Sequence, residues 1–100
     1  MNGQERSYKK QGQHMKSESV ADIEGVWVEP EFESGLIQRC RENWTVPISD
    51  LSNHALATFI RQRLGLNAVV PEAQRRIELG YSDDSELYDD ELAKAIGALA

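Results

Sequence analysis

Apolar residues in this chain recur at spacings of three and four residues, in short segments that prolines, glycines and capping residues separate. Such spacings place apolar side chains on one face of an α-helix. The four stripes are Leu36, Ile37, Cys40 and Trp44; Leu56, Phe59, Ile60 and Leu64; Val69, Val70, Ala73 and Ile77; and Leu92, Ile96 and Leu99. No long alternating segment indicates a β-sheet. The pattern therefore predicts an all-α fold, a compact bundle of about four short helices with an extended N-terminal arm.

Prolines and a serine mark the ends of the first two predicted helices. Pro30 suits a first helical turn, where a missing N–H has no intrahelical partner. Pro47 ends this helix, because the residue before a proline is pushed out of the α region. Ser52 is a good N-cap for the second helix, and Gly65 fits the left-handed position at its C-terminus.

Similar signals bound the third and fourth predicted helices. Asn67 can cap the third helix, with Pro71 in its first turn. Gly80 stops it. Asp89 can cap the last helix, which runs to the end of the sequence.

The 100 residues suit one small domain. Residues 1–19 are polar, so they bury too little apolar surface to offset the entropy of ordering, and we expect a flexible tail. Residues 20–100 form a single helical domain in this prediction. Its first segment, residues 20–30, mixes β-branched residues with Trp27 and is expected to be an extended arm over a hydrophobic surface.

The charge of the chain is unevenly distributed. The net charge is −6, but residues 20–100 hold seven basic and fifteen acidic side chains, a balance of −8. An acidic body repels phosphate backbones and attracts a basic protein, so direct nucleic-acid binding is disfavoured. The single cysteine, Cys40, suits a reducing compartment. The N-terminus lacks an apolar run and no segment could span a bilayer, so we expect a cytoplasmic protein without membrane contact.

The stretch "YSDDSELYDDEL", residues 81–92, contains six carboxylates and no basic residue. No register of it fits the twelve-residue calcium loop, which needs a glycine at position six and a glutamate at position twelve. Catalysis by paired carboxylates would need a desolvated cleft. Two interpretations remain open, a solvated surface loop and a protein-recognition patch. The candidate binding residues are Tyr81, Asp83, Asp84, Glu86, Tyr88, Asp90 and Glu91.

A second acidic run lies near the N-terminal arm and also lacks basic residues. It consists of Asp22, Glu24, Glu29, Glu31 and Glu33, with Trp27 and Phe32 among them. This run supports a recognition surface, although Trp27 is equally well explained as a core tryptophan.

We predict no catalytic residue, metal or cofactor. Neither His14 nor His54 forms a metal-ligand spacing with Cys40. Asp50, His54 and the neighbouring serines crowd one turn, which is typical of a helix start and not of a catalytic triad. Cys40 lies on an apolar stripe, where a buried structural thiol is expected.

The stretch "VPISDLSNHALATFIRQRLGLNAVVPEAQRRIELGYSDDSELYDDELAKAI" resembles the immunity proteins of bacterial contact-dependent growth inhibition systems. The resemblance covers about half the chain and is a distributed pattern of core positions. The matching positions are Pro47, Ile48, Leu51, Leu56, Ile60, Gln62, Gly65, Leu66, Val70, Pro71, Ala73, Ile77, Tyr88, Leu92 and Ile96.

The resemblance implies a non-enzymatic inhibitor in the bacterial cytoplasm. Its partner would be the cognate C-terminal toxin domain of a large cell-surface effector, often a nuclease, and binding would protect the cell from self and sibling intoxication. The acidic candidate residues would then be toxin-binding residues. A small acidic helical adaptor or regulatory subunit without a toxin partner is the alternative.

Overall fold

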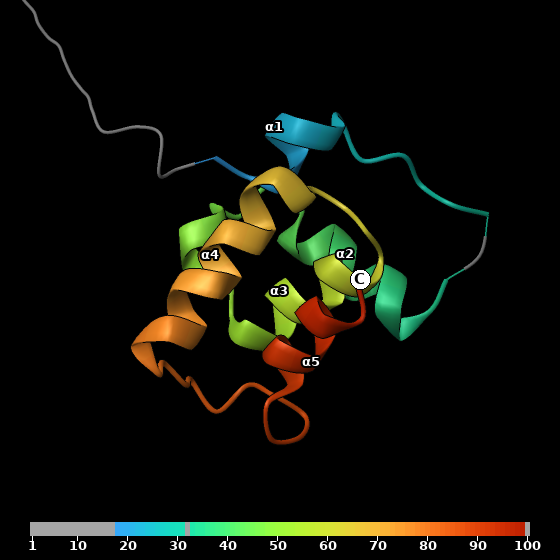
Figure 1. The fold of residues 1–100 in the computed structure, drawn as a ribbon. Coiled ribbons are helices and arrows are strands. Elements are labelled where there is room, and N and C mark those ends of the chain that lie inside the picture. Colours follow the sequence, from blue (N-terminus) through green and yellow to red (C-terminus); the bar gives the residue numbers. More distant parts are fainter. Residues whose placement is uncertain (1–17, 32, 100) are drawn as a thin grey trace, which may run out of the picture.

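The computed structural model describes residues 18–31 and 33–99. Six helices in these ranges form one bundle (Figure 1). The elements in chain order are α1 (Val20–Glu24), α2 (Gly35–Asn43), the 3₁₀ helix η2 (Ile48–Asp50), α3 (Asn53–Arg61), α4 (Leu66–Leu79) and α5 (Glu91–Gly97). The all-α prediction is confirmed, with two short helices, α1 and η2, that the pattern did not predict. No helix among the described residues combines the length and apolarity that a membrane crossing requires.

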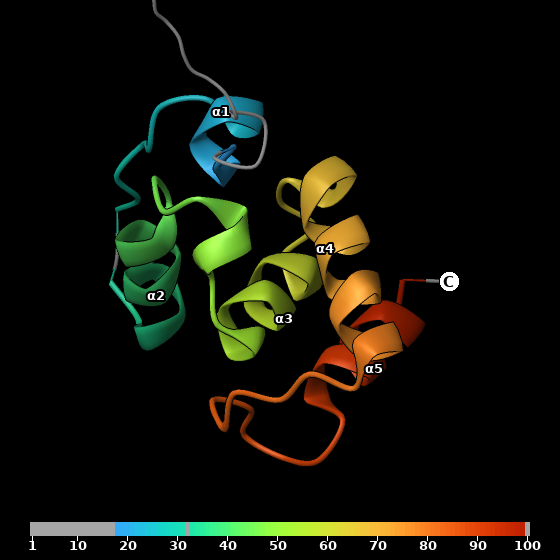
Figure 2. The same cartoon turned by 90° about the vertical axis from the view of Figure 1, so that its left-hand side faces the viewer.

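Helix α3 lies at the centre of the bundle. It packs against α2 on one side and against α4 and α5 on the other (Figure 2). Every residue of 55–60 is buried, as expected for a helix that neighbours surround. Its N-terminus is capped by Ser52, whose hydroxyl accepts a hydrogen bond from the Ala55 N–H at 3.0 Å, so this predicted cap is confirmed.

The two tryptophans link the N-terminal segment to the core. The ring of Trp44 packs edge-on against Trp27, with centroids 5.0 Å apart, and also lies 6.2 Å from the ring of Phe59. The indole N–H of Trp44 donates to the Gly25 carbonyl at 2.7 Å. Trp27 is therefore packed against the core, although the neighbouring Val26 is 88% exposed.

Helix α1 corrects the prediction of a fully extended arm. Ser19 and Asp22 form a capping box, a pairing of short polar side chains that starts a helix locally. The arm is fixed to the bundle by two backbone hydrogen bonds, from the Ala21 N–H to the Trp44 carbonyl and from the Ile48 N–H to the Glu18 carbonyl. The fold thus begins by residue 18, and the rest of the expected tail, residues 1–17, lies outside the described residues.

The start of α2 also differs from the prediction. Pro30 lies upstream of the helix, and the N-cap is Ser34, whose hydroxyl accepts from the Ile37 N–H at 3.1 Å. A serine side chain satisfies a free N–H, whereas a proline only avoids having one, so the serine determines the helix start. The helix ends at Asn43, a few residues before Pro47, and buries Cys40 as expected.

The turn between α3 and α4 corrects two further predictions. Gly65 has the expected left-handed conformation (φ 61°), but it directly precedes α4 and does not end α3. A Cβ at this position would lie 3.2 Å from a methyl group of Val20. Because α4 begins at Leu66, Asn67 is inside the first turn and Pro71 lies one turn further on, where its missing N–H leaves a carbonyl without its helical donor.

Helix α4 buries a face that is rotated from the predicted one. Val69 and Ala73 are buried as expected, but the next inward position is occupied by Arg76 (5% exposed), and Ile77 is 41% exposed. Ile77 is therefore not a core residue.

The arginine is buried because it joins α4 to the residues before α3. Its guanidinium donates to the Leu51 carbonyl at 2.7 Å, to Asn53 Oδ1 at 2.9 Å and to Glu72 Oε2 at 2.7 Å. A buried charge that is paired and hydrogen-bonded in this way avoids most of the penalty of desolvation. Spacing alone cannot distinguish this position from an apolar one.

Candidate functional site: the hollow beside the acidic loop

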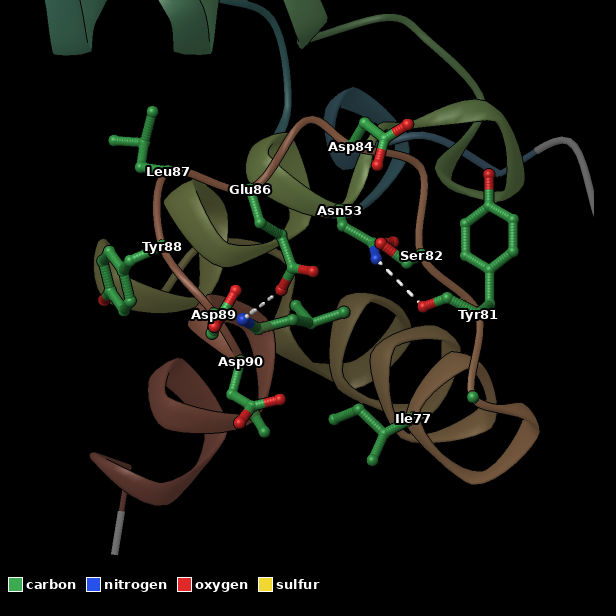
Figure 3. Close-up of a pocket in the computed structure, with 13 residues that line it drawn as sticks. Asn53, Ile77, Tyr81, Ser82, Asp84, Glu86, Leu87, Tyr88, Asp89 and Asp90 are labelled. Carbon is green, nitrogen blue, oxygen red and sulfur yellow. Dashed lines mark hydrogen bonds between the residues drawn. The ribbon is translucent and has the colours of Figure 1, made fainter.

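The acidic loop, residues 81–90, connects the end of α4 to the start of α5 and passes the N-terminus of α3 (Figure 1). It borders an open hollow of ≈ 600 Å³, the α4–α5 hollow, whose other lining residues are Asn53, Ile77, Gly80, Leu92 and Ala93. Figure 3 shows the hollow with Ile77 projecting from α4 toward α5, and with Leu87 and Tyr88 at the outer edge of the loop. Five of the seven residues of the predicted patch, all except Asp83 and Glu91, therefore line one concave surface.

The loop begins at a left-handed glycine. Gly80 (φ 71°) ends α4 as predicted. The Gly80 N–H donates to the Ile77 carbonyl at 3.1 Å, and the Tyr81 N–H donates to the Arg76 carbonyl at 2.9 Å. The ring of Tyr81 then lies beside the Arg76 guanidinium, 5.3 Å from ring centre to carbon, with half of its surface exposed.

Asp83 points inward and caps α3 from the loop. Its carboxylate accepts from the Asn53 N–H at 2.8 Å and from the Ser85 N–H at 3.0 Å. Ser85 in turn accepts from the His54 N–H at 2.9 Å, so two free N–H groups at the start of α3 are satisfied. Burial alone would raise the pKa of the Asp83 carboxyl, but hydrogen bonds from Ser85 and Asn53 and the nearby Arg76 charge lower it below its ordinary value.

Glu86 and Glu91 connect the loop to α5 reciprocally. The Glu86 carboxylate accepts from the Leu92 N–H at 2.8 Å, and the Glu91 carboxylate accepts from the Leu87 N–H at 2.9 Å. The first of these bonds is visible in Figure 3. Helix α5 starts at Glu91, after Asp90 in a left-handed conformation (φ 64°) whose side chain makes no capping bond. The prediction that Asp89 caps α5 is therefore wrong, because Glu86 supplies the capping oxygen.

Glu91 is completely buried. In addition to the Leu87 N–H, its carboxylate contacts His54 Nδ1 at 3.1 Å and Arg61 Nη2 at 2.9 Å, both from α3. Burial by itself would raise the pKa of Glu91, but the hydrogen bonds from Leu87, His54 and Arg61 reverse this effect and hold the pKa below its ordinary value. The side chain is therefore not part of the exposed surface of the loop.

We call Asp84, Asp89 and Asp90 the outer aspartates, because all three are exposed and line the α4–α5 hollow. Within the described part of the chain, none of their carboxylates makes an ion pair or a side-chain hydrogen bond. Tyr88 is 49% exposed beside them, and the Lys94 ammonium lies 5.3 Å from the centre of its ring. This is the surface of the loop that remains available for contact.

The predicted patch thus separates into two sets. Tyr81, Asp84, Tyr88 and Asp90 lie on the surface, while Asp83, Glu86 and Glu91, which we call the inner carboxylates, form hydrogen bonds within the protein. The lining residues of the hollow that the predicted set omitted are Asn53, Ile77, Gly80, Ser82, Leu87, Asp89, Leu92 and Ala93. Asp89 could have been included from its neighbours in sequence, but nothing in the sequence indicated the contribution of α4.

The other acidic run is largely paired, contrary to the prediction. The Glu24 carboxylate accepts from the Gly65 N–H at 2.9 Å, and Glu29 accepts from the Trp27 indole at 2.8 Å. Arg41 forms ion pairs with Glu29 at 3.8 Å and with Glu33. Phe32 lies outside the described residues. Most carboxylates of this run therefore have partners within the fold, although Arg41 is the only cation that pairs with them in the described ranges.

No group of three His, Cys, Asp or Glu side chains in residues 18–31 and 33–99 could hold a metal ion. Burial raises the pKa of the Cys40 thiol above its ordinary value, despite the nearby Arg39 charge, which favours the unreactive thiol form. Exposed, solvated carboxylates such as the outer aspartates serve electrostatic attraction better than proton transfer.

Searches against protein-family models, curated proteins and solved structures returned no match to this chain.

Proposed function

We propose that this protein is a non-enzymatic binding protein of the bacterial cytoplasm that neutralises a basic partner, the C-terminal toxin domain of a contact-dependent growth inhibition effector. The observation that supports the proposal is that the carboxylates of the acidic loop fall into two groups. Three inner carboxylates hold the loop against α3 and α5. The three outer aspartates line one hollow and form no ion pair with any described residue.

Preorganisation makes such a loop effective in binding. A mobile loop would lose conformational entropy when a partner orders it, and that loss would subtract from the affinity. Here the inner carboxylates form hydrogen bonds to backbone N–H groups of Asn53, Leu87 and Leu92 before any partner arrives. The outer aspartates are therefore held in place for an incoming cation.

The charge distribution favours a basic partner. Carboxylates without internal partners attract positive charge over about a Debye length and increase the rate of encounter. Half-exposed Tyr81 and Tyr88, with exposed Leu87, supply the aromatic and apolar area that stabilises a complex after encounter. A nuclease that binds nucleic acid through a basic surface has the matching charge, and an inhibitor with this surface would compete with the phosphate backbone.

The choice of a toxin as the partner depends on the resemblance of residues 46–96 to immunity proteins. We therefore test the proposal with the toxin domain encoded by the gene immediately upstream. Coexpression of this chain should restore growth to cells that produce the toxin domain. Absence of rescue and of binding would reject the toxin partner and favour the alternative, an acidic adaptor or regulatory subunit.

A charge-matched pair of variants tests the surface. In the first, Asp84, Asp89 and Asp90 are replaced by Ser; in the second, the exposed and distant Glu18, Glu31 and Asp50 are replaced by Ser. At low salt the first variant should associate with the toxin domain about tenfold more slowly than wild type, with a flatter dependence on salt. The second variant changes the net charge equally and should slow association far less.

Thermal unfolding of both triple variants should remain close to wild type, because exposed charges contribute little to stability. Equal slowing of association by the two triple variants would show that net charge alone acts, and would contradict the assignment of the binding surface to the loop.

A further inference from the structure

Two apolar residues, Ile77 of α4 and Ala93 of α5, are exposed between these helices. Ile77 and Ala93 line the α4–α5 hollow and also a smaller hollow of ≈ 350 Å³, which Gln74, Glu78 and Ile96 complete. The two hollows are therefore neighbours that share Ile77 and Ala93 as lining residues. We call the combined depression the α4–α5 groove; it runs from the acidic loop along the seam between the two helices.

The two residues that the hollows share are apolar, whereas carboxylates stand around them. Ile77 is 41% exposed, and Ala93 is exposed beside it. Together they offer a small apolar contact that one side chain of a partner can cover. The surrounding carboxylates are the outer aspartates and Glu78, all exposed and without an ion pair to any residue in the described ranges.

We propose that the α4–α5 groove binds a short basic segment of the partner polypeptide, which places one apolar side chain over Ile77 and Ala93 and its flanking Lys or Arg residues against the outer aspartates. The proposal rests on the proposed function, since the partner is the same toxin domain. It adds a chemical description of the segment that is bound: an apolar residue between basic ones.

Charge complementarity selects this occupant over the others. A second copy of this chain related by a two-fold axis would bring its own Asp84, Asp89 and Asp90 against the same residues, and like charges across an interface are repulsive. A nucleic acid would be repelled for the same reason. A basic polypeptide gains from the surrounding carboxylates and covers the two apolar residues.

Two substitutions on α4 compare the loss of apolar area inside the groove with the same loss elsewhere on the surface. Ile77→Gln removes apolar area from the groove, whereas Leu79→Gln removes it from a site on the same helix that is 69% exposed and outside the groove. Ile77→Gln should increase the dissociation rate of the complex with the toxin domain about tenfold and leave the association rate unchanged. Leu79→Gln should change neither rate.

A third variant keeps the test decisive if Ile77→Gln lowers stability. Ala93 is exposed on α5, so Ala93→Trp should fill the groove without loss of core packing, and the complex should weaken about tenfold or more. Circular dichroism and thermal unfolding of each free variant provide the control for folding. If wild type binds the toxin domain and all three variants bind like wild type, the groove proposal is overturned while the proposed function stands.

If wild type does not bind the toxin domain, the proposed function fails, and the groove is tested alone with the synthetic peptide Lys-Lys-Leu-Lys-Lys. Chemical-shift changes at Ile77 and Ala93 of wild type, with the change at Ile77 lost in Ala93→Trp, would support the groove as a site for a basic segment, and an absence of changes in wild type would overturn it. Residues 1–17 are the other basic candidate. Shift changes at Ile77 and Ala93 in the full chain when Lys9 and Lys10 become Ser, without peptide, would assign the groove to that segment and overturn the proposal.

Discussion

Residues 22–33 and residues 83–91 are both rich in carboxylates, yet the two segments use them differently. In the first segment, Glu24 bonds to the backbone of the α3–α4 turn, and Glu29 and Glu33 pair with Arg41 on α2. In the second segment, the only lysine or arginine that pairs with a carboxylate within the described ranges is Arg61, which contacts the buried Glu91. Within the same ranges, the outer aspartates have no such partner.

The comparison shows that density of acidic residues does not identify a binding surface by itself. What distinguishes the second segment is that some carboxylates hold the backbone in place through hydrogen bonds, while others remain free at its edge. Asp84 and Asp90 even adopt left-handed backbone conformations, with φ of 65° and 64°, which aspartate tolerates better than most residues. A loop shaped in this way displays charge at fixed positions.

The largest effect on stability is expected when Glu91, the buried carboxylate of the second segment, is replaced. Glu91→Ala would leave the largely buried His54 and the exposed Arg61 without their carboxylate, and would free the Leu87 N–H. We expect a loss of about 3 kcal/mol in the free energy of unfolding, because the part-buried Leu87 N–H and His54 ring both lose their hydrogen-bond partner. Chemical denaturation of Glu91→Ala, beside the exposed control Asp89→Ala, measures this difference.

The control should lose less than about 0.5 kcal/mol, since an exposed side chain away from special features contributes little. Similar losses in Glu91→Ala and Asp89→Ala would mean that the inner carboxylates do not hold the loop, and the two acidic segments would differ only in sequence.

Local signals in the sequence predicted the helix boundaries well where one residue acts on its own backbone. Ser52 caps α3 and Gly80 ends α4 as expected, because a hydroxyl cap and a left-handed glycine act within one turn. The start of α5 was missed, because its capping oxygen comes from Glu86, six residues before the Leu92 N–H that it accepts from. Sequence patterns do not encode such a contact.

The sequence predicted which residue types form the candidate site, but not which of these residues are buried. The acidic loop does line a hollow, but its inner and outer carboxylates have the same chemistry, and only the tertiary structure decides which of them face α3. Ile77 was expected on the buried face of α4, but it is 41% exposed and Arg76 is buried instead. A helical stripe gives the spacing of buried positions, whereas the polar groups before α3 make Arg76 the favourable inward residue.

A smaller effect is expected at Asp83, and it depends on pH. Asp83→Asn keeps the size of the side chain but weakens the charge-assisted bonds from the Asn53 and Ser85 N–H groups. We expect a loss of about 1–2 kcal/mol at neutral pH. Because folding lowers the pKa of Asp83 below its ordinary value of 3.8, its contribution is complete above that value and is lost as the pH falls through the folded value.

The measurement is the free energy of unfolding of wild type and Asp83→Asn from neutral pH to about pH 2. The gap between the two proteins should be widest at neutral pH and should narrow on acidification below 3.8, the ordinary value for this carboxyl. A gap that stays constant over the whole range would show that the charge of Asp83 does not stabilise the α3 N-terminus.

The smallest expected effect contrasts one carboxylate from each segment. Glu33 is 58% exposed and pairs with Arg41, which is 31% exposed, so Glu33→Gln should cost only about 0.5 kcal/mol of stability. Asp84→Asn should cost even less stability, since Asp84 forms no ion pair with any residue in the described ranges.

The association rate with the toxin domain should show the opposite order, with the larger effect at Asp84. Asp84→Asn should slow association with the toxin domain about twofold at low salt, and Glu33→Gln should leave it unchanged. Stopped-flow association and chemical denaturation of the two variants test both halves. Slower association in Glu33→Gln than in Asp84→Asn would transfer the binding surface from the acidic loop to the N-terminal segment.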